Sequence, residues 1–374
     1  MSLPVKPKMR AVVKFAEGPG NVEVREVPTP ELGSRDVLIA VRACTVDMTD
    51  VDIWRWKPPM GVPITRRQAP WMRRSWVKIP VILGAEIAGE VVKVGSDVRR
   101  VGVGDRVVVK YGLEPCGECP QCRLGHYELC EAVIQVGRMT DGGFAEYIKV
   151  PEAAAIKFPD NLTFEEAAPT EMVVTAFHSF WMTRVRPGMT VAIFGPGVVG
   201  LFAVQIAKTY GARKVILIGV TGDEKRLELG KELGADVIIN SSKEDVFDVV
   251  MRETDDMGVD LALDFTGHPE AINKAFDIVT VRGTIHCTGN PRTGIRGEVT
   301  VPWIAINAKE ITITGSKVWR ATTDEWLRAL DLMRQGKIKT RPLLGNRYPL
   351  EKWQEAFEAR ESRRELLPVI VPWG

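Results

Sequence analysis

The sequence predicts an α/β protein in which a doubly wound parallel sheet is joined to a separate domain of β structure. Two observations predict this fold class. From Thr190 to Thr314, β-branched runs alternate with helical stretches, and such alternation requires a parallel sheet covered by helices. From Met9 to Lys110, short runs of strand type follow one another with turn residues between them, which is typical of a sandwich or a partly open barrel.

Length and composition narrow the class of protein. The chain has 374 residues, enough for two full cores, and its 45% hydrophobic and 26% charged content is typical of a soluble globular protein. A net charge of +2 predicts neither nucleic-acid binding nor attachment to a membrane surface. The most apolar window, Val191–Val204, is shorter than the roughly 20 residues of a membrane span and contains Gly and Pro. We therefore expect a cytoplasmic protein that acts on a small-molecule substrate.

The first domain is expected to hold five short strands before a cysteine-rich segment and one strand after it. These strands are Ala11–Phe15, Val22–Val27, Val37–Val41, Gly89–Val94 and Asp105–Val109, followed by one within Gly142–Val150. Helical sequence then begins near Thr163, which forms a capping-box pattern with Glu166.

Residues 54–79 interrupt the first domain with an irregular segment rich in Pro, Trp and Arg. One interpretation is a solvated loop that its tryptophans hold in place. The other is a flap that offers arginines to an anionic substrate or to a cofactor. We favour the first interpretation.

Four of the six cysteines lie within fifteen residues, at Cys116, Cys119, Cys122 and Cys130. Two-residue spacings of this kind are typical of metal chelation in a reducing compartment. Four thiolates complete a tetrahedron around Zn²⁺ and leave no position open for substrate, so the sequence predicts one structural zinc per chain. His126 lies inside this lobe and is expected to be a surface residue.

A glycine-rich turn follows the strand that begins at Thr190, in the order Gly195-Pro-Gly197-Val198-Val199-Gly200. The first glycine permits a tight turn, the second lets the backbone approach a pyrophosphate, and the third lets the helix lie close to the strand. The motif alone is weak, because glycines also mark ordinary turns. A strand precedes it and a helix follows, so we expect a dinucleotide cradle.

The α/β alternation continues to the end of the second domain. The expected elements are a helix Glu224–Leu233, a strand Asp236–Ile239, a helix near Glu244–Glu253, a strand Val259–Asp264, a helix Pro269–Val279, and strands Gly283–Cys287 and Glu310–Thr314. Ligands on such sheets bind at the carboxyl ends of the strands, so Thr266, Gly289 and Gly315 are expected at the rim of the cofactor site, unless they only form turns. Two amphipathic helices then precede a last strand, Leu367–Val371, which is expected to return to the first domain.

The end of the second strand of this sheet bears on the choice of cofactor. NAD-binding proteins place an acid there, whereas NADP-binding proteins leave room and a cation for the 2′-phosphate. The strand ends at Gly219 without an acid, and Thr221, Lys225 and Arg226 are suited to a phosphate. Asp223 is able to fold back to a ribose, so both cofactors remain open and we favour NADP.

The glycine turn, the four-cysteine lobe and their order resemble the medium-chain dehydrogenase/reductase superfamily, in particular the zinc-type alcohol, sorbitol and threonine dehydrogenases. The segments Gly142-Gly-Phe-Ala-Glu-Tyr147 and Arg226–Asp236 share the resemblance. It implies a GroES-like catalytic domain at residues 9–168, completed by residues 318–374, and a Rossmann domain at residues 169–317. It also implies dimers or tetramers, with Val301–Thr314 resembling the family's inter-subunit edge strand.

The chain departs from this family in the catalytic site. Asp47 stands where the family has a zinc thiolate, Ala85 where it has a histidine ligand, and Asp52 where it has a relay histidine. The resemblance retains Thr49 as the hydroxyl relay, together with two acids, Glu86 and Glu171.

Loss of the Cys and the His removes the ligands that zinc prefers. The carboxylates of Asp47, Glu86 and Glu171 are expected to hold a harder divalent ion or a weakly bound zinc, or else to share a proton with a raised pKa. We favour the absence of a tightly bound catalytic zinc on ligand chemistry alone. The segment from Cys44 to Asp47 also resembles the zinc-free branch of the superfamily, which gives this loss a precedent. Asp50 or Asp52 has the alternative role of capping a helix.

The expected activity is hydride transfer between C4 of NAD(P) and a small alcohol or polyol, or its ketone or aldehyde. Thr49 would pass the hydroxyl proton, Asp52 would take it toward solvent, and Asp47, Glu86 and Glu171 would polarise the oxygen. Two alternatives remain: a zinc-free reductase of an activated C=C bond, of the enone or quinone type, and a non-catalytic NAD(P)H-binding redox sensor.

Overall fold

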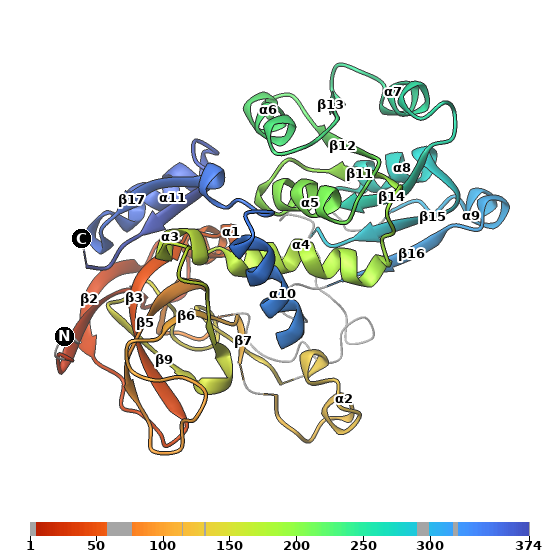
Figure 1. Cartoon of the computed structure of the whole chain (residues 1–374). Coiled ribbons are helices and arrows are strands. Elements are labelled where there is room, and N and C mark those ends of the chain that lie inside the picture. Colours follow the sequence, from red (N-terminus) through yellow and green to blue (C-terminus); the bar gives the residue numbers. More distant parts are fainter. Residues whose placement is uncertain are drawn as a thin grey trace.

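The computed structural model describes residues 5–57, 77–113, 115–130, 132–289, 299–316 and 321–373. The chain forms a domain of β structure and a domain built on a parallel sheet, with helices α4 and α10 between them (Figure 1). Both ends of the chain lie on the β domain. Most of the Arg- and Trp-rich segment, residues 58–76, lies outside the described residues.

The β domain is organised around a seven-stranded sheet, in which β10, β6, β5, β3, β18 and β17 are successive neighbours and β9 also pairs with β3. A three-stranded sheet in the order β2-β1-β4 belongs to the same domain. The strands are β1 Lys8–Lys14, β2 Val22–Pro28, β3 Asp36–Thr45, β4 Val81–Ile82, β5 Glu86–Val94, β6 Arg106–Val109, β9 Tyr147–Pro151, β10 Ala155–Lys157, β17 Leu344–Tyr348 and β18 Leu367–Ile370.

The end of the chain returns to this domain. Strand β18 pairs with β3 through Ile370 and Cys44. Helix α11, Trp353–Glu361, packs its aromatic side chains on helix α1, Met48–Trp54, where Trp54 meets Trp353 and Phe357 edge-to-face at ring distances of 5.8 and 5.9 Å. These contacts bury aromatic surface from segments 300 residues apart in sequence, so the tail is part of the β domain core.

The second domain is the doubly wound sheet that the alternation predicts. Its strand order is β13-β12-β11-β14-β15-β16, which is the 3-2-1-4-5-6 order of a Rossmann fold, and all its described pairs are parallel. Helices α4 and α5 cover one face of the sheet, while α7 and α8 cover the other. The elements are β11 Thr190–Phe194, α5 Val198–Thr209, β12 Lys214–Gly219, α6 Glu224–Glu232, β13 Val237–Asn240, α7 Val246–Glu253, β14 Val259–Asp264, α8 Pro269–Ile278, β15 Val279–Cys287, α9 Trp303–Lys309 and β16 Thr312–Gly315.

Two helices with capping boxes lie at the junction of the domains. Thr163 accepts from the amide of Glu166 at 3.2 Å and Glu166 accepts from the amide of Thr163 at 2.9 Å, which confirms the predicted cap of α3, Phe164–Ala167. Helix α10, Thr323–Arg334, begins with the same device at Thr322 and Glu325. Helix α4, Thr170–Thr183, runs between the two domains (Figure 1).

Two local differences from the sequence expectations affect the site. Helix α1 was expected only as an alternative, with Asp50 or Asp52 as its cap, whereas its N-cap is Asp47. The strand expected at residues 142–150 begins only at Tyr147. The residues before it form a turn that packs on the backbone of Gly84, where a Cβ on Gly142 would lie 2.2 Å from the carbonyl oxygen.

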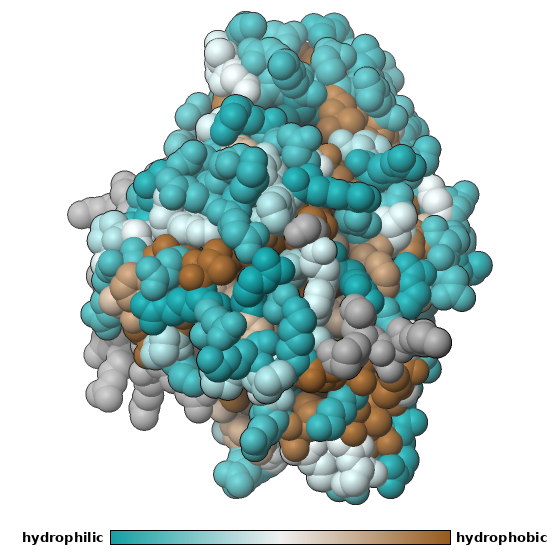
Figure 2. Space-filling view, turned by 90° about the vertical axis from the view of Figure 1, so that its left-hand side faces the viewer, coloured by the Kyte–Doolittle hydropathy of each residue, from teal (hydrophilic) through white to brown (hydrophobic). Residues whose placement is uncertain are grey.

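The described surface is mostly polar. Hydrophilic side chains cover most of the face in Figure 2, and apolar side chains gather there in separate patches. No helix in the described ranges is both long enough and apolar enough to cross a membrane.

Candidate active site

The glycine turn has the geometry of a pyrophosphate cradle. Gly195 adopts φ +98°, a conformation that side chains strongly disfavour. A Cβ on Gly200 would lie 2.0 Å from the carbonyl oxygen of Gly195, so only glycine lets α5 approach the turn this closely. Gly197 is the N-cap of α5 and faces open space. The first amide groups of this 12-residue helix, which begins at Val198 and Val199, therefore suit an anion, and the residues fit a dinucleotide.

Three strand ends meet at the rim of this cradle, as expected. A Cβ on Gly195 would touch Thr266 at 2.8 Å, and a Cβ on Gly289 would lie 2.1 Å from the amide nitrogen of Gly267. Gly315 pairs with Cys287 on the neighbouring strand. The hydroxyl of Thr266 donates to Asp264 at 2.6 Å, so this residue also shapes its own turn.

A chain of buried and half-buried polar groups joins α4 to the same edge of the sheet. The hydroxyls of Ser179 and Thr288 lie 2.9 Å apart, those of Thr288 and Ser316 lie 2.9 Å apart, and Ser316 contacts Nε2 of His286 at 2.9 Å. Burial, together with nearby His178, lowers the pKa of His286 to about 4, so its imidazole is neutral at physiological pH. Sequence analysis missed this network, since its members belong to three separate elements.

The end of β12 holds the residues that face the adenosine ribose in such folds. Asp223 folds back toward Gly219 and accepts from the amide of Val220 at 3.3 Å. Its carboxylate also lies 3.9 Å from Arg226 and 3.4 Å from Arg363, which comes from the other domain. Thr221 and Lys225 are exposed beside them. Both an acid and cations are therefore present at this end of the cradle.

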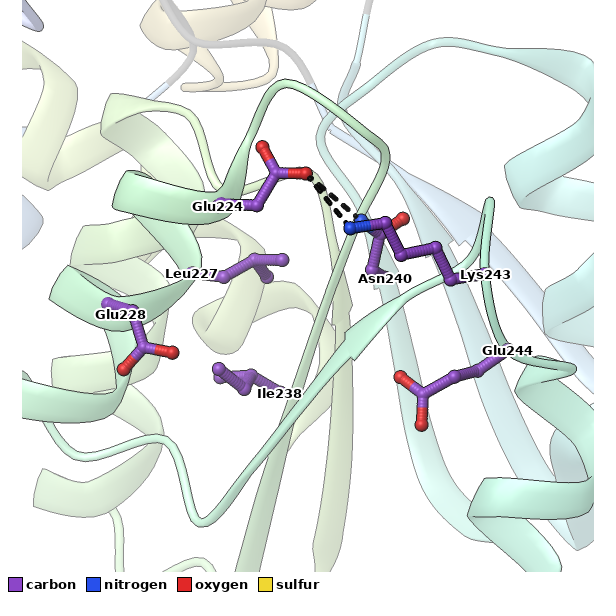
Figure 3. A pocket seen from close by; sticks show the side chains of 7 residues that line it. All are labelled: Glu224, Leu227, Glu228, Ile238, Asn240, Lys243 and Glu244. Atoms are coloured by element: carbon purple, nitrogen blue, oxygen red, sulfur yellow. Dashed lines mark hydrogen bonds and ion pairs between the residues drawn. The ribbon is translucent and has the colours of Figure 1, made fainter.

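A shallow hollow of about 190 Å³ lies beside this turn, between α6 and β13 (Figure 3). Within it, Glu224 accepts from Asn240 at 3.3 Å and pairs with Lys243 at 3.6 Å. Glu228 and Glu244 add two further carboxylates to the lining. Three acids against one lysine disfavour the phosphates of a dinucleotide, so this hollow is separate from the cofactor cradle.

The catalytic candidates cluster where α1, β5 and α4 meet. Asp47 is the N-cap of α1, and it forms a capping box with Asp50, whose carboxylate accepts from the amide of Asp47 at 3.0 Å. Asp50 also accepts from the amide of Gly84 at 3.1 Å, which ties α1 to the segment that leads into Glu86. Asp47 and Asp50 therefore cap α1, whereas Asp52 lies further along the helix.

Glu86 and Glu171 are buried acids from the two different domains. Burial raises the pKa of Glu171 to about 8, with a further contribution from Asp47. Burial also raises the pKa of Glu86, and the nearby Asp47 and Glu171 act in the same direction. One oxygen of Glu86 accepts from Thr45, whereas Oε1 is buried without a hydrogen-bond partner among the described residues. An acid left in this state favours its protonated form.

The remaining candidates lie near Asp47 or Glu86 in the sequence. Thr49 lies half-buried in the first turn of α1, and Ala85, next to Glu86, is also half-buried. Asp47 and Ala85 offer neither a thiolate nor an imidazole, and Asp47 is already engaged as a helix cap. Among the described residues, the four cysteines are the one group of three or more His, Cys, Asp or Glu ligands close enough to share an ion. The residues of the cleft therefore do not fit a catalytic zinc.

Tyr111 and Arg138 adjoin the acids and were missed by sequence analysis. Both are buried, and Arg138 acts electrostatically on the phenol of Tyr111. Burial raises the pKa of Tyr111 to about 12; Arg138 opposes this shift, and Glu171 and Asp47 add to it. No sequence signal marks the two residues, which are 27 positions apart and belong to no motif.

The cysteine lobe fits a structural zinc. It consists of β7 Gly112–Leu113, α2 Pro120–Arg123, a 3₁₀ turn at Tyr127–Leu129 and β8 Ile134–Gln135. The Sγ atoms of all four cysteines lie within 4.8 Å of one another, and those of Cys116 and Cys130 are 3.6 Å apart. A zinc tetrahedron with 2.3 Å bonds has edges of about 3.8 Å. Backbone amides also donate to these sulfurs, as at Cys119 to Cys116 over 3.3 Å, and His126 is exposed.

Comparison with known proteins agrees with this architecture. The alcohol dehydrogenase GroES-like domain matches residues 33–160, and the zinc-binding dehydrogenase domain matches residues 198–335. Fold and site together define an NAD(P)-dependent oxidoreductase. More closely, the chain belongs to the zinc-type alcohol dehydrogenase-like family of the medium-chain dehydrogenase/reductase superfamily.

Similar proteins span nearly the whole chain. An L-threonine 3-dehydrogenase from Symbiobacterium thermophilum is 34% identical over 365 residues, which cover 97% of this chain and 98% of that protein. A sorbitol dehydrogenase from Bacillus subtilis is 34% identical and covers 94% of both chains. A Sinorhizobium meliloti structure with bound NADP superposes with a TM-score of 0.84 at 29% identity, covering 98% of this chain and 100% of the other.

The cysteine lobe leads to a first prediction. The purified protein should contain about one zinc per chain, and Cys130→Ser should lose it and lower the melting temperature by on the order of 5 °C, because three thiolates no longer close the tetrahedron. Metal analysis and thermal unfolding measure both effects. Cys287→Ser, which changes a cysteine outside the lobe, should keep the metal. Full zinc content in Cys130→Ser would contradict the assignment, and two zinc ions per chain would place a second metal in the cleft.

Proposed function

We propose that this enzyme transfers a hydride between C4 of NAD(P) and a carbon of a small alcohol or polyol, or of its ketone or aldehyde. The observation that supports it best is the electrostatic coupling of Glu171, from α4, with Glu86 and Asp47, from the β domain. L-threonine and sorbitol, named in the relatives above, are both small polar alcohols.

In carbonyl reduction, the chain's acids supply the proton. Reduced cofactor provides the hydride at C4. Glu171 holds a proton at neutral pH because burial raises its pKa to about 8, so it is poised to protonate the developing oxygen. Glu86, whose pKa is also raised, adds no negative charge beside this proton when it is itself protonated.

Thr49 and Asp52 complete the proposed proton path. The hydroxyl of Thr49 lies on the first turn of α1 and would pass the proton of the substrate hydroxyl. Asp52 lies three residues along the helix, half-buried, and would take this proton toward solvent. An acid in this position carries out the exchange that the family assigns to a histidine.

We further propose that NADP is preferred over NAD. Arg226 and Arg363 approach the same edge of the cradle from the two domains, beside Lys225 and Thr221. The carboxylate of Asp223 already pairs with both arginines, which offset its negative charge. A 2′-phosphate bound there would therefore be repelled less by this acid. Reduced thiolates in the zinc lobe favour a reducing compartment, which supports a cytoplasmic location.

The proposed function is tested by turnover. Purified enzyme should oxidise small polyols or reduce their ketones and aldehydes, with a lower KM for NADP(H) than for NAD(H), in a spectrophotometric assay. A chelator that leaves the structural zinc in place should not change the rate, because polarisation comes from protonated acids. Turnover of enones alone would instead identify the zinc-free C=C reductase, which the absence of zinc-type ligands at Asp47 and Ala85 also suits. Loss of activity on chelation would indicate a catalytic metal.

The raised pKa of Glu171 predicts a pH dependence. Carbonyl reduction needs its protonated form, so kcat should be constant below pH 8 and fall as the pH rises through about 8. Glu171→Gln should lower kcat by about a hundredfold or more and abolish the fall of kcat near pH 8. Glu165→Gln, a neighbouring acid of α3 that pairs with Arg347, serves as the control.

The same shift has a consequence for stability. Between pH 4.5 and about 8 the folded protein holds a proton on Glu171 that the unfolded chain has released, so stability should fall as the pH rises through this window. Glu171→Gln should flatten that slope in denaturant titrations. An unchanged slope and an unchanged rate profile would show that Glu171 is not the titrating acid.

We also propose that the enzyme forms a dimer through β16. This strand is the edge of the parallel sheet, and an unpaired edge is a template for pairing with a second copy. Beside it, α9 exposes Trp303 by 72% and Ile304 by 83%, and Ile313 on the strand itself is 48% exposed. Apolar surface next to an open strand edge suits a symmetric interface, and the sequence here resembles the family's inter-subunit strand.

Light scattering tests the dimer. The wild-type protein should have twice the 41.5 kDa mass of one chain, and Ile313→Lys should shift it toward the monomer, because a charge at the centre of the pairing edge is not compensated. Val103→Lys, which adds the same charge at an exposed apolar residue of the β domain, should leave the mass unchanged. A wild-type monomer would refute the proposal.

A further inference from the structure

Arg363 extends from the β domain to the adenosine end of the cradle. It follows α11, and its Nη1 lies 3.4 Å from Oδ1 of Asp223, the residue that precedes α6 in the other domain. Asp223 is placed by the cradle itself, because a Cβ on Gly219 would lie 3.2 Å from the Cβ of Asp223 and 3.0 Å from Pro196 of the glycine turn. The pair therefore joins the two domains where the adenosine ribose of a dinucleotide is expected to bind.

The backbone of Arg363 has a conformation that suits glycine better. Arg363 adopts φ +61°, directly after Ser362, the C-cap of α11. Helices often carry glycine at this position, because a Cβ is disfavoured at positive φ. The arginine therefore occupies this position at a conformational cost, and such a cost is typical of residues with a functional role.

The turn that carries Arg363 is anchored on the β domain. The amide of Glu365 donates to the carbonyl of Ala359 in α11 at 3.2 Å, which closes the turn. The carboxylate of Glu365 accepts from the amide of Asn346 at 2.9 Å and from the hydroxyl of Tyr348 at 2.7 Å, and both belong to β17. The guanidinium of Arg363 is thus presented to the other domain from a fixed backbone.

Most donors of this guanidinium remain available to a ligand. A guanidinium has five N–H donors, and within the described ranges the side chain of Arg363 contacts Asp223 alone, through Nη1. The side chain is 47% exposed. At 3.4 Å the contact is also long for a hydrogen bond, so an oxygen of a phosphate is able to replace the carboxylate.

The same contact limits what Asp223 is able to bind. Its Oδ1 faces Arg363 and, at 3.9 Å, Arg226, whereas its Oδ2 accepts from the amide of Val220 at 3.3 Å. An acid that selects NAD accepts a hydrogen bond from the ribose 2′-hydroxyl, for which it needs an available oxygen. Both oxygens of Asp223 are already engaged, and arginines offset its charge.

We propose that Arg363 decides which dinucleotide binds. It engages the carboxylate of Asp223 and offers its remaining N–H groups to a 2′-phosphate, which favours NADP(H). Without this side chain, Asp223 loses its nearer arginine and accepts from the 2′-hydroxyl of NAD(H) instead. The inference rests on the proposed function, and it adds that a residue of the β domain sets the cofactor choice of the sheet domain.

The chain offers variants that separate the side chain from the fold. Arg363→Gly removes the guanidinium and relieves the positive φ, so the melting temperature should stay the same or rise. Loss of the ion pair itself has little effect on stability, because the arginine is half-exposed. Arg364→Gln is the control, since Arg364 is the exposed neighbour and donates to Ser362 at 3.1 Å instead of to Asp223.

The experiment measures binding by calorimetry with two unreactive ligands, ADP-ribose and ADP-ribose phosphorylated at the 2′ position of its adenosine. Arg363→Gly should bind the phosphorylated ligand about tenfold more weakly and ADP-ribose about threefold more tightly, whereas Arg364→Gln should match wild type. Arg363→Lys should keep part of the preference, because an ammonium retains the charge but loses the fork. Adding Asp223→Asn to Arg363→Gly should abolish the gain for ADP-ribose.

The outcomes separate this inference from the proposed function. Wild-type affinities of Arg363→Gly for both ligands, in an enzyme that turns over polyols, would refute the role of Arg363 and leave the function standing. An equal loss of affinity for both ligands, or a lower melting temperature, would make the residue structural and overturn the inference. A wild-type protein without turnover, whose preference for the 2′-phosphate is lost in Arg363→Gly, would refute the function and retain the inference.

Discussion

Steric contact between the glycine turn and helix α5 decides where the chemistry takes place. The helix can approach the turn only because Gly200 has no side chain. A Cβ on Gly200 would lie 2.0 Å from the carbonyl oxygen of Gly195. That approach aims the first amides of α5 at one point, beside the strand ends that carry Thr266 and Gly289. A dinucleotide bound there would extend along the carboxyl edge of the sheet, toward the other domain.

The second feature of the site is a set of buried acids whose pKa values are raised. Buried carboxylates repel one another and lose hydration, so each is more stable when protonated. In a zinc enzyme of this architecture, a cation would relieve this cost. Here the pKa values of Glu171 and Asp50 both rise to about 8, and a capping box engages Asp47. In the proposed function, these acids supply the protons and hydrogen bonds that the substrate oxygen needs.

Sequence reasoning succeeded where chemistry is local. The four cysteines, the glycine turn and the capping box at Thr163 depend on residues that are close in sequence, and each appears in the structure as expected. The β/α alternation also predicted the parallel sheet, although strand ends shifted by a few residues, as at β5, which begins at Glu86 instead of Gly89. Helix α1 was anticipated only as an alternative, capped by Asp50 or Asp52, because seven residues give too little periodicity to predict a helix.

The sequence by itself predicted the glycine turn of the cofactor cradle and the four-cysteine zinc lobe, because each depends on residue type at short spacing. Only the tertiary structure decided which carboxyl groups share a cleft and which of them are buried. Desolvation and charge repulsion act between residues such as Asp47, Glu86 and Glu171, which lie on elements far apart in the chain. For the same reason, the Tyr111–Arg138 pair and the polar chain ending at His286 became visible only once the two domains had packed around α4.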